Sequence, residues 1–266
     1  MLICKICKSK KLIKKFEYLK KPKKETLYSK INYKKYHRFY YKCQNCDHYS
    51  GYYKMSISNL YSSTYNDSLY SGKLKKNFDK IKNLPPLQSD NFFRAERVDK
   101  FINKNNLKDK NLKVLDIGTG LGIFPYSMKK KGYSVTGIDP DKRSCSHLRK
   151  NLKIRAIHGN FLKLKIKKKF DLVTLNKVIE HIANPKLMLS KVKKILNKNG
   201  HLYIEVPDIA AAKLGKNREE FHLDHLHVFS KSSLLYLSRQ LKLKKLNIKS
   251  IKEPSGKFTI FGFFKK

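Results

Sequence analysis

From residue 113 onward, short apolar runs alternate with stretches whose apolar residues recur at helical spacing. Short apolar runs favour buried strands, and spacings of three and four favour helices. The spacing of Phe93, Val98, Phe101 and Ile102 predicts an amphipathic helix just before this region. We expect strands over 114–117, 133–139, 154–157, 170–175 and 201–206. Helices are expected over 92–106, 141–152, 185–196 and 230–241, and one more runs from the Gly-rich turn after the first strand to about residue 131.

Local signals give the expected ends of these elements. Asn199-Gly200 is typical of a helix C-cap, Asp141 lies at a possible N-cap, and Ser230 is expected to cap the helix that follows it. Two β-rich runs, 243–251 and 257–264, flank Pro254-Ser255-Gly256 and predict a hairpin. Alternating strands and helices imply an α/β fold, a Rossmann-like doubly wound and mostly parallel sheet, with an antiparallel terminal hairpin.

The chain divides into three regions. Residues 1–54 hold four of the five cysteines, residues 55–91 form a polar, Tyr-rich connector, and residues 92–266 carry the α/β pattern. No apolar run reaches the ~18–20 residues that span a bilayer. The N-terminus lacks a signal-peptide core, so we expect a cytoplasmic protein with thiols or metal rather than disulfides.

The net charge is +41, from 61 Lys and Arg against 20 Asp and Glu. Such a charge attracts polyanions, nucleic acid included. Lysine predominates and is spread over the whole chain, whereas nucleic-acid sites usually favour Arg on one face. We therefore favour a solvated surface over a nucleic-acid partner, without excluding the latter.

The strongest chemical signal is a glycine loop, Asp116-Ile117-Gly118-Thr119-Gly120-Leu121-Gly122, between a predicted strand and a helix. Glycines let the backbone approach a ligand closely. The spacing differs from the G-x-G-x-x-G dinucleotide fingerprint, and no Gly-Lys-Ser/Thr follows as in a P-loop. Asp139, at the end of the next strand, could accept hydrogen bonds from both hydroxyls of an adenosyl ribose.

This arrangement resembles the class I S-adenosylmethionine-dependent methyltransferases over roughly residues 92–266. An NAD-type enzyme is the alternative for the loop alone. The resemblance implies S-adenosylmethionine as cofactor and adenine contacts in Gly159-Asn160-Phe161. Val178-Ile179-Glu180-His181-Ile182-Ala183-Asn184-Pro185 resembles the E-H-x-x-x-P signature of the small-molecule branch. The expected cofactor-binding residues are Asp116, Gly118, Thr119, Gly120, Gly122, Asp139, Asn160, Phe161 and Asn176.

Two C-x-x-C knuckles, Cys4/Cys7 and Cys43/Cys46, supply four soft ligands and predict a structural Zn²⁺ in a small zinc-ribbon-like module. Alternating Tyr and Lys over 33–41 could form its strands. Unliganded thiols are the alternative, and the lone Cys145 is expected to be a buried thiol. The knuckles, followed by Leu60-Tyr61, Tyr65 and Tyr70, resemble bacterial enzymes with an N-terminal zinc domain, sugar C-methyltransferases among them.

After the fifth strand, a polar loop carries His222, Asp224, His225 and His227. A loop at the carboxyl end of the sheet should overhang the methyl donor, and a His oriented by a carboxylate can accept the acceptor's proton. In the resembling sugar C-methyltransferases an acid-His pair lies next to a Tyr; Asp224-His225 could match the pair, with His222 in place of the Tyr. The candidate catalytic residues are His225, Asp224, His222 and His181, and a structural role or a metal site in this loop is the alternative.

We therefore expect methyl transfer to a small-molecule acceptor, a sugar or polysaccharide-pathway metabolite, including nucleotide-linked sugars. An RNA methyltransferase using the basic surface is one alternative, although no N/D-P-P-Y/F motif follows the fourth strand, where Asn176-Lys177-Val178 stands. A non-catalytic nucleic-acid-binding protein with a retained cofactor fold is another.

Overall fold

The computed structural model describes residues 2–29, 31–57, 60, 73–107 and 112–266. Within the connector expected over 55–91, residues 58–59 and 61–72 lie outside the described part. Three tyrosines on which the zinc-domain resemblance drew, Tyr61, Tyr65 and Tyr70, are among them.

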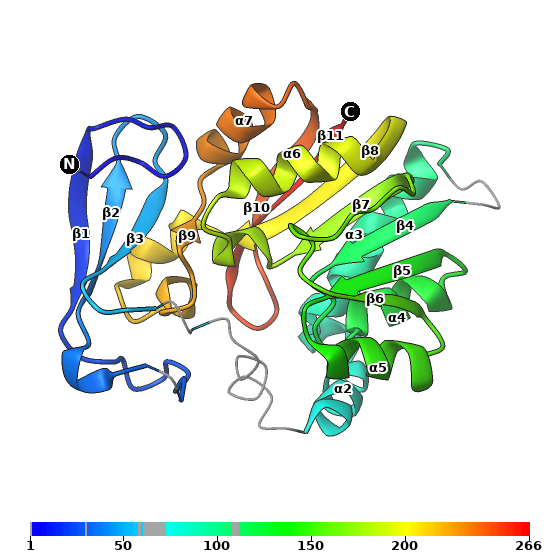
Figure 1. The fold of residues 1–266 in the computed structure, drawn as a ribbon, viewed down its shortest axis with the longest axis horizontal. Coiled ribbons are helices and arrows are strands. Elements are labelled where there is room, and N and C mark those ends of the chain that lie inside the picture. The colour runs from blue at the N-terminus through cyan, green and yellow to red at the C-terminus, as the bar shows by residue number, and fades with distance from the viewer. Residues whose placement is uncertain (1, 30, 58–59, 61–72, 108–111) are drawn as a thin grey trace.

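A seven-stranded sheet in the order β10-β11-β8-β7-β4-β5-β6 forms the centre of the molecule (Figure 1). Strands β4 to β8 pair in parallel, and the last two strands pair antiparallel as a hairpin on the edge beyond β8. This topology confirms the predicted fold class and the terminal hairpin. The strands are β4 Lys113–Ile117, β5 Ser134–Asp139, β6 Arg155–His158, β7 Phe170–Asn176, β8 Leu196–Pro207, β10 Lys244–Lys252 and β11 Phe258–Lys265.

Helices cover both faces of this sheet because successive side chains of each strand point to opposite faces. Val114 packs with helices α3 and α4, whereas Leu115 and Ile117 lie in the core beneath α6 and α7. A further cluster packs α2 against the α4–α5 side. The helices are α2 Leu74–Lys82, α3 Asp90–Lys104, α4 Ile123–Lys130, α5 Lys142–Lys150, α6 Pro185–Ile195 and α7 Lys231–Gln240.

Of two helix caps predicted from the sequence, one is confirmed and the other is wrong. Ser230 caps α7 as predicted, since its side chain accepts the backbone N–H of Ser233 in a reciprocal capping box. The C-cap expected at Asn199-Gly200 is wrong: α6 ends at Ile195 and β8 begins at the next residue. Asn199 has φ 65°, and the pairing of β8 with β7 shifts register between Phe170 and Leu172, so this Asn-Gly pair lies in a bulge of the strand.

A second sheet of four strands contains the N-terminal residues, in the order β1-β2-β3-β9. Its strands are β1 Leu12–Tyr18, β2 Arg38–Cys43, β3 Tyr49–Tyr53 and β9 His227–Val228. The Tyr/Lys alternation is strand only from Arg38 onward, because Tyr33–Lys35 form a short 3₁₀ helix that Asn32 caps. Strand β9 comes from the segment after β8, so the two parts of the chain share one sheet (Figure 1).

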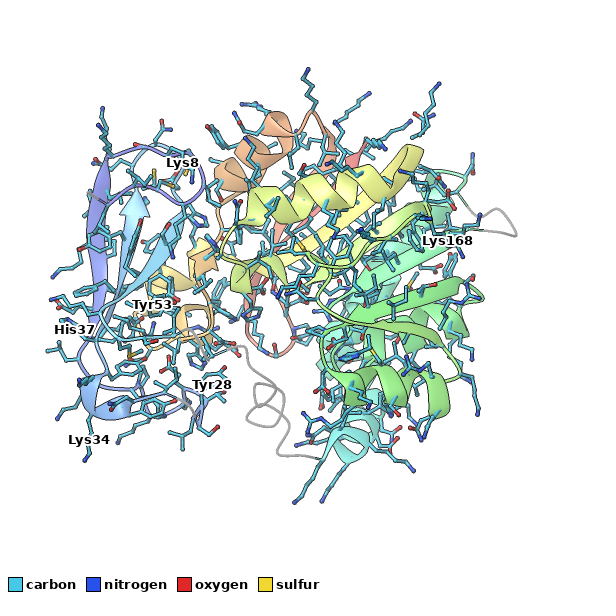
Figure 2. All side chains as sticks on the ribbon, viewed as in Figure 1. Lys8, Tyr28, Lys34, His37, Tyr53 and Lys168 are labelled. Atoms are coloured by element: carbon cyan, nitrogen blue, oxygen red, sulfur yellow. The ribbon has the colours of Figure 1, made fainter. Side chains whose placement is uncertain are left out.

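The lysines occupy widely separated surfaces. Lys8, Lys34 and Lys168 are all exposed and lie at separate ends of the molecule (Figure 2). This spread is typical of a solvated surface. Within the described ranges, no helix is long and apolar enough to cross a bilayer.

Candidate functional site

A pocket of about 1220 Å³ opens at the carboxyl ends of β4, β5 and β7. The strand order reverses between β4 and β7, and ligands of open α/β sheets bind at such a switch point. The pocket brings together most of the residues singled out from the sequence: Asp116, Gly118, Thr119, Gly120, Asp139, Asn160, Phe161, Asn176, His181, Asp224 and His225.

The glycine loop follows β4 directly and needs glycine for two different reasons. Gly118 has φ 76° and lines the pocket, and an added Cβ would lie 2.6 Å from Cγ2 of Val178. Gly122 has φ 80°, but it does not line the pocket; it caps α4, and its Cβ would meet Cδ1 of Leu148 at 2.8 Å. Gly122 was expected to bind cofactor, and the structure instead places it where α4 begins against α5.

Asp139 ends β5 and is almost fully buried. Its two carboxylate oxygens accept the backbone N–H groups of Gly120, at 2.9 Å, and Asp141, at 2.8 Å. Burial raises the pKa of Asp139 to about 6, although these hydrogen bonds oppose the shift. Each carboxylate oxygen has a second lone pair, so this side chain can still accept ligand hydroxyls.

Asp116 lies at the base of the pocket beside β7. Its Oδ1 accepts the hydroxyl of Thr174 at 2.7 Å and the amide of Asn176 at 2.8 Å. Burial raises its pKa to about 7 despite both hydrogen bonds. The amide oxygen of Asn176 is buried without a hydrogen-bond partner among the described residues, so Asn176 retains an acceptor for a ligand donor.

The loop of residues 219–230, here called the histidine loop, lies with His181 at the other end of the pocket. Nδ1 of His181 lies 2.8 Å from the carbonyl oxygen of Asp224, whose carboxylate is 3.7 Å away. His225 turns its Nδ1 to the carbonyl oxygen of Glu220, at 3.0 Å, rather than to Asp224. Burial lowers the pKa of His225 to about 4, so its ring is neutral near pH 7. His222 does not line the pocket.

Cationic side chains also line the pocket, and no local sequence motif predicts them. Arg94 in α3 reaches the pocket while it pairs with Glu205, and Lys177 donates to the hydroxyl of Thr259 at 2.6 Å. Lys142, Arg143 and Lys257 also line the pocket. Since lysine is frequent along the whole chain, only the fold distinguishes these residues from the solvated ones.

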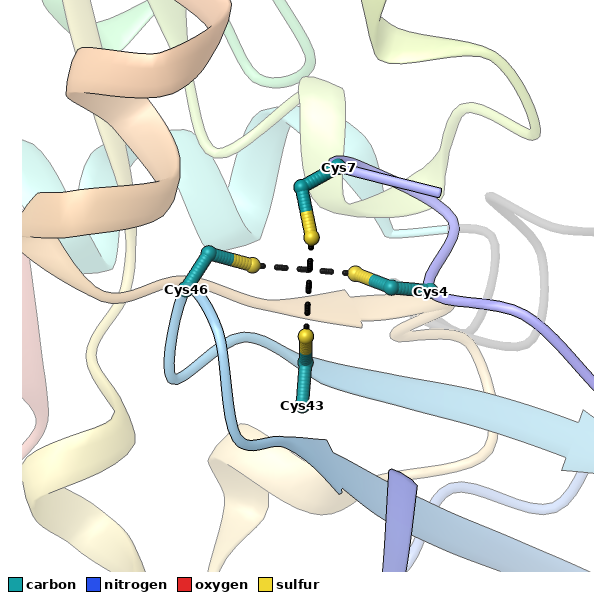
Figure 3. A group of neighbouring side chains, drawn as sticks. All are labelled: Cys4, Cys7, Cys43 and Cys46. Carbon is teal, nitrogen blue, oxygen red and sulfur yellow. Dashed lines mark hydrogen bonds between the residues drawn. The ribbon is translucent and has the colours of Figure 1, made fainter. Parts of the chain in front are cut away.

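The four cysteines of the two knuckles come together in one cluster (Figure 3). Sγ of Cys4 lies 3.7 Å from that of Cys46, and Sγ of Cys7 lies 3.5 Å from that of Cys43. Tetrahedral zinc with bonds of about 2.3 Å requires sulfur atoms roughly 3.8 Å apart. The donor set and its spacing therefore fit a structural zinc ion that is fully coordinated by protein.

The cysteine module is fastened to the histidine loop. Nη1 of Arg38 donates to the carbonyl oxygen of Phe221 at 2.7 Å, and the hydroxyl of Tyr40 donates to the carbonyl oxygen of His225 at 2.5 Å. The backbone N–H of Gly51 donates to Leu226, and the hydroxyl of Ser230 donates to the carbonyl of Cys46. One wall of the pocket is thus held by the N-terminal residues.

Comparisons with known proteins agree with this geometry. A family model described as a methyltransferase domain matches residues 91–245, more than half of the chain. The ubiquinone biosynthesis O-methyltransferase of Pelagibacter ubique is 35% identical over 120 residues, which cover 40% of this chain and 50% of that protein. Its counterpart from Pasteurella multocida is 30% identical over 107 residues, 34% of this chain and 44% of that protein. The chain thus spans about half the length of the curated relatives it matches.

Solved structures show the same fold at low sequence identity. The Burkholderia thailandensis 1,6-didemethyltoxoflavin-N1-methyltransferase, with bound 1,6-didemethyltoxoflavin and S-adenosylhomocysteine, has a TM-score of 0.60 at 14% identity, covering 91% of this chain and 99% of that one. The magnesium protoporphyrin IX methyltransferase of Synechocystis PCC 6803 with bound S-adenosylhomocysteine has a TM-score of 0.59 at 11% identity, covering 76% and 96%. The narrower resemblance to sugar C-methyltransferases stays a prediction. From the family model, the sheet order and the glycine-loop pocket together, the chain belongs to the methyltransferase domain family.

Proposed function

We propose that this chain transfers the methyl group of S-adenosylmethionine to a hydroxyl oxygen of a small-molecule acceptor. One observation carries the proposal: a single pocket joins the glycine loop and Asp139 at one end to His181 and His225 at the other. A methyltransferase needs both ends, because it must bind the donor and hold the acceptor in line with it.

The donor end suits S-adenosylmethionine, which when bound supplies an electrophilic methyl group on a sulfonium. Asp139 would accept the ribose hydroxyls, and Gly118 and Gly120 would let the backbone approach the ligand, with Thr119 between them. Asn160 and Phe161 would contact the adenine. Asp116 and Asn176 offer acceptor oxygens beneath the glycine loop for a ligand ammonium.

The acceptor end would remove the hydroxyl proton. His181 and His225 both line the pocket, and each imidazole is oriented by a backbone carbonyl at Nδ1. An imidazole held in this way can accept a proton at its other nitrogen. Asp224 would orient His181, while His222, outside the pocket lining, would support the loop rather than contact the acceptor.

The acceptor proposed here is a hydroxylated metabolite that carries negative charge. The O-methyltransferase names of the curated relatives favour a hydroxyl oxygen. Lys142 and Lys257 in the pocket wall favour an anionic group, which agrees with the sugar-pathway expectation, nucleotide-linked sugars included.

The cysteine cluster is proposed to bind one structural zinc ion, which the four sulfur atoms would coordinate fully. Metal analysis of the purified chain should find one zinc per protein, and Cys43→Ser should lose it. Cys145→Ser is the matched control, because Cys145 lies outside the cluster and should leave the zinc content unchanged.

The experiment that tests the methyltransferase proposal is calorimetric titration with S-adenosylmethionine, followed by a transfer assay with labelled methyl donor. Wild-type protein should bind the cofactor and Asp139→Ala should bind it far more weakly. Nucleotide sugars and phenolic hydroxyl compounds should then be compared with RNA as acceptors. Absence of cofactor binding by folded protein, or transfer to RNA alone, would overturn the proposal.

A further inference from the structure

An unusual carboxylate lies behind the acceptor end of the pocket. Glu180 belongs to a short 3₁₀ helix, Ile179–His181, and is fully buried. Neither of its carboxylate oxygens has a hydrogen-bond partner in the described part of the chain. A buried carboxylate normally pairs with a cation or several donors, because leaving its charge uncompensated is very costly. Among the described residues, no cation or donor is hydrogen-bonded to the carboxylate of Glu180.

Two imidazoles surround this carboxylate. A ring nitrogen of His181, a ring nitrogen of His225 and a carboxylate oxygen of Glu180 all lie within 4.8 Å of one another. His181 is adjacent to Glu180 in sequence, whereas His225 is brought in by the loop that the cysteine module holds. Three donors from two distant segments of the chain thus lie close together.

The hydrogen bonds of the two rings fix which nitrogen can act as a ligand. Nδ1 of His181 and Nδ1 of His225 each face a backbone carbonyl oxygen, at 2.8 and 3.0 Å. A carbonyl can only accept, so Nδ1 carries the proton in each neutral ring and the lone pair lies on Nε2. Metal-binding histidines usually show this arrangement, with the second ring nitrogen donating to a carbonyl or carboxylate.

We propose that Glu180, His181 and His225 bind a divalent transition-metal ion, separate from the zinc of the cysteine cluster. Two imidazoles and one carboxylate are a donor set that such ions accept while keeping open positions. Donors at about 2.1 Å from one ion lie roughly 3–4 Å apart, so small side-chain rotations would close the site. Because both histidines line the pocket and Glu180 lies behind them, the open positions would face the acceptor.

The ion would give the acceptor end a specific chemical role. A bound divalent ion lowers the pKa of a coordinated hydroxyl and holds its oxygen in place. With the ion bound, Nε2 of His181 and of His225 would be ligands, so the hydroxyl proton would leave to water and the histidines would act through the ion rather than as bases. Acceptors with two neighbouring oxygens would then be favoured, since they can occupy two open positions. This consequence rests on the proposed function, whereas metal binding itself does not.

Cobalt titration of the full zinc-loaded chain tests the site, with visible absorption and calorimetry as readouts. Wild-type protein should bind one added Co²⁺ per chain, with d–d absorption and without the sulfur-to-cobalt charge-transfer band of a thiolate site. Glu180→Gln and His225→Gln should each weaken this binding by at least about tenfold. Glu219→Gln, an exposed acid of the same loop, is the matched control and should bind as wild type does.

Several results would overturn the metal site: no added cobalt bound by wild type, thiolate-type absorption alone, or equal affinity in wild type and both variants. The His225→Gln protein keeps the test decisive if Glu180→Gln does not fold, as circular dichroism would show. Failure of the methyltransferase proposal would appear separately, as lost S-adenosylmethionine binding in protein that still binds cobalt.

Discussion

Asp139 experiences two opposing influences on the same carboxyl group. Burial at the end of β5 favours its neutral form, and the backbone N–H groups of Gly120 and Asp141 favour its charged form. Burial is the stronger influence, so the pKa is raised to about 6. The proposed ribose hydroxyls would add donors and thereby favour the charged form.

This balance predicts a pH dependence of cofactor binding. Since the ionised carboxylate is the form that accepts two hydroxyls, affinity for S-adenosylmethionine should be level above pH 7. It should then fall as the pH decreases through 6, by about tenfold per pH unit at most, because the proton must leave before the ligand binds. Calorimetry from pH 5 to 8 measures this. Asp139→Asn should bind weakly and lack the component near pH 6, and an unchanged profile in that variant would assign the titration to Asp116 instead.

The residue scale is also where the sequence was most informative about the site. Asp116, Gly118, Gly120 and Asp139 are adjacent to strand ends, so a local motif was enough to predict that they share one pocket. The relation of Glu180 to His225 could not be predicted, because only the tertiary fold brings the loop back to the 3₁₀ helix. The lysines that line the pocket could not be predicted for a different reason, because the chain contains so many other lysines.

At the scale of elements, helix α3 is fastened to strand β8 by buried charges. Arg94 and Arg97 both contact Glu205, which is fully buried, and Arg97 also reaches Glu253 at 3.0 Å. Burial alone would raise the pKa of Glu205, but the two arginines outweigh it and hold the pKa well below its usual range. The pairing thus positions Arg94 at the pocket wall.

Glu205→Gln should destabilise the fold by about 3–5 kcal/mol, because it leaves buried guanidinium groups without their carboxylate. Since the folded-state pKa is depressed, this stabilisation is complete above the unfolded pKa and is lost as the pH falls toward the folded value. Urea unfolding at pH 7 and at pH 3.5 should therefore show a larger difference between wild type and variant at pH 7. Glu219→Gln, at an exposed site, should change stability little, and an equally small change in Glu205→Gln would refute the argument.

Ser230 connects helix α7 to the N-terminal cysteine module. Its hydroxyl oxygen accepts the N–H of Ser233 at the start of α7, and its proton is donated to the carbonyl of Cys46 at 2.6 Å. Ser230→Ala should cost about 1–2 kcal/mol, because it removes a helix cap and leaves a buried carbonyl without its donor. Thermal unfolding compares it with Ser232→Ala, an exposed neighbour that should change little. Equal effects of the two substitutions would show that the cap and the Cys46 contact contribute nothing measurable.

The predicted elements succeeded where hydrophobic periodicity determines structure and failed where a local signal has two meanings. Strands β4, β5 and β7 lie close to their expected ranges because their apolar runs are buried on both faces. The end of α6 was predicted to within one residue, but Asn199-Gly200 is not its C-cap. A positive φ suits a helix C-cap and a strand bulge equally, and only pairing with β7 decides between them.

On the scale of the whole molecule, the N-terminal module and the methyltransferase domain share a wall of the pocket. Strand β9 pairs Val228 with Tyr49 and His227 with Ser50, which completes the smaller sheet. Its two residues have no periodicity of their own, so the sequence predicted a separate module with a boundary at residue 54. In the structure, the histidine loop is held by contacts with the N-terminal residues Arg38, Tyr40 and Tyr49.

This dependence predicts what removal of zinc would do. Without the metal, the knuckles of Cys4/Cys7 and Cys43/Cys46 lose their cross-link, and β3 with the loop it holds should open more often. Hydrogen exchange followed by mass spectrometry should therefore become faster over residues 38–53 and 219–230 after chelation. It should change little over the glycine loop, which β4 supports directly.

Removal of zinc should affect cofactor binding and methyl transfer differently. S-adenosylmethionine affinity should stay within about twofold, since Asp139 and Gly118 lie on the central sheet, whereas methyl transfer should fall with the order of the loop that carries His225. Because a chelator would also remove the ion proposed at Glu180, His181 and His225, Cys43→Ser should show the same slower transfer when that ion is supplied, and zinc restored to the wild type together with that ion should recover both exchange protection and transfer. If chelation leaves exchange over 219–230 unchanged, the module is only a neighbour of the loop; if cofactor affinity falls as steeply as transfer, the effect is global unfolding and not loss of one wall.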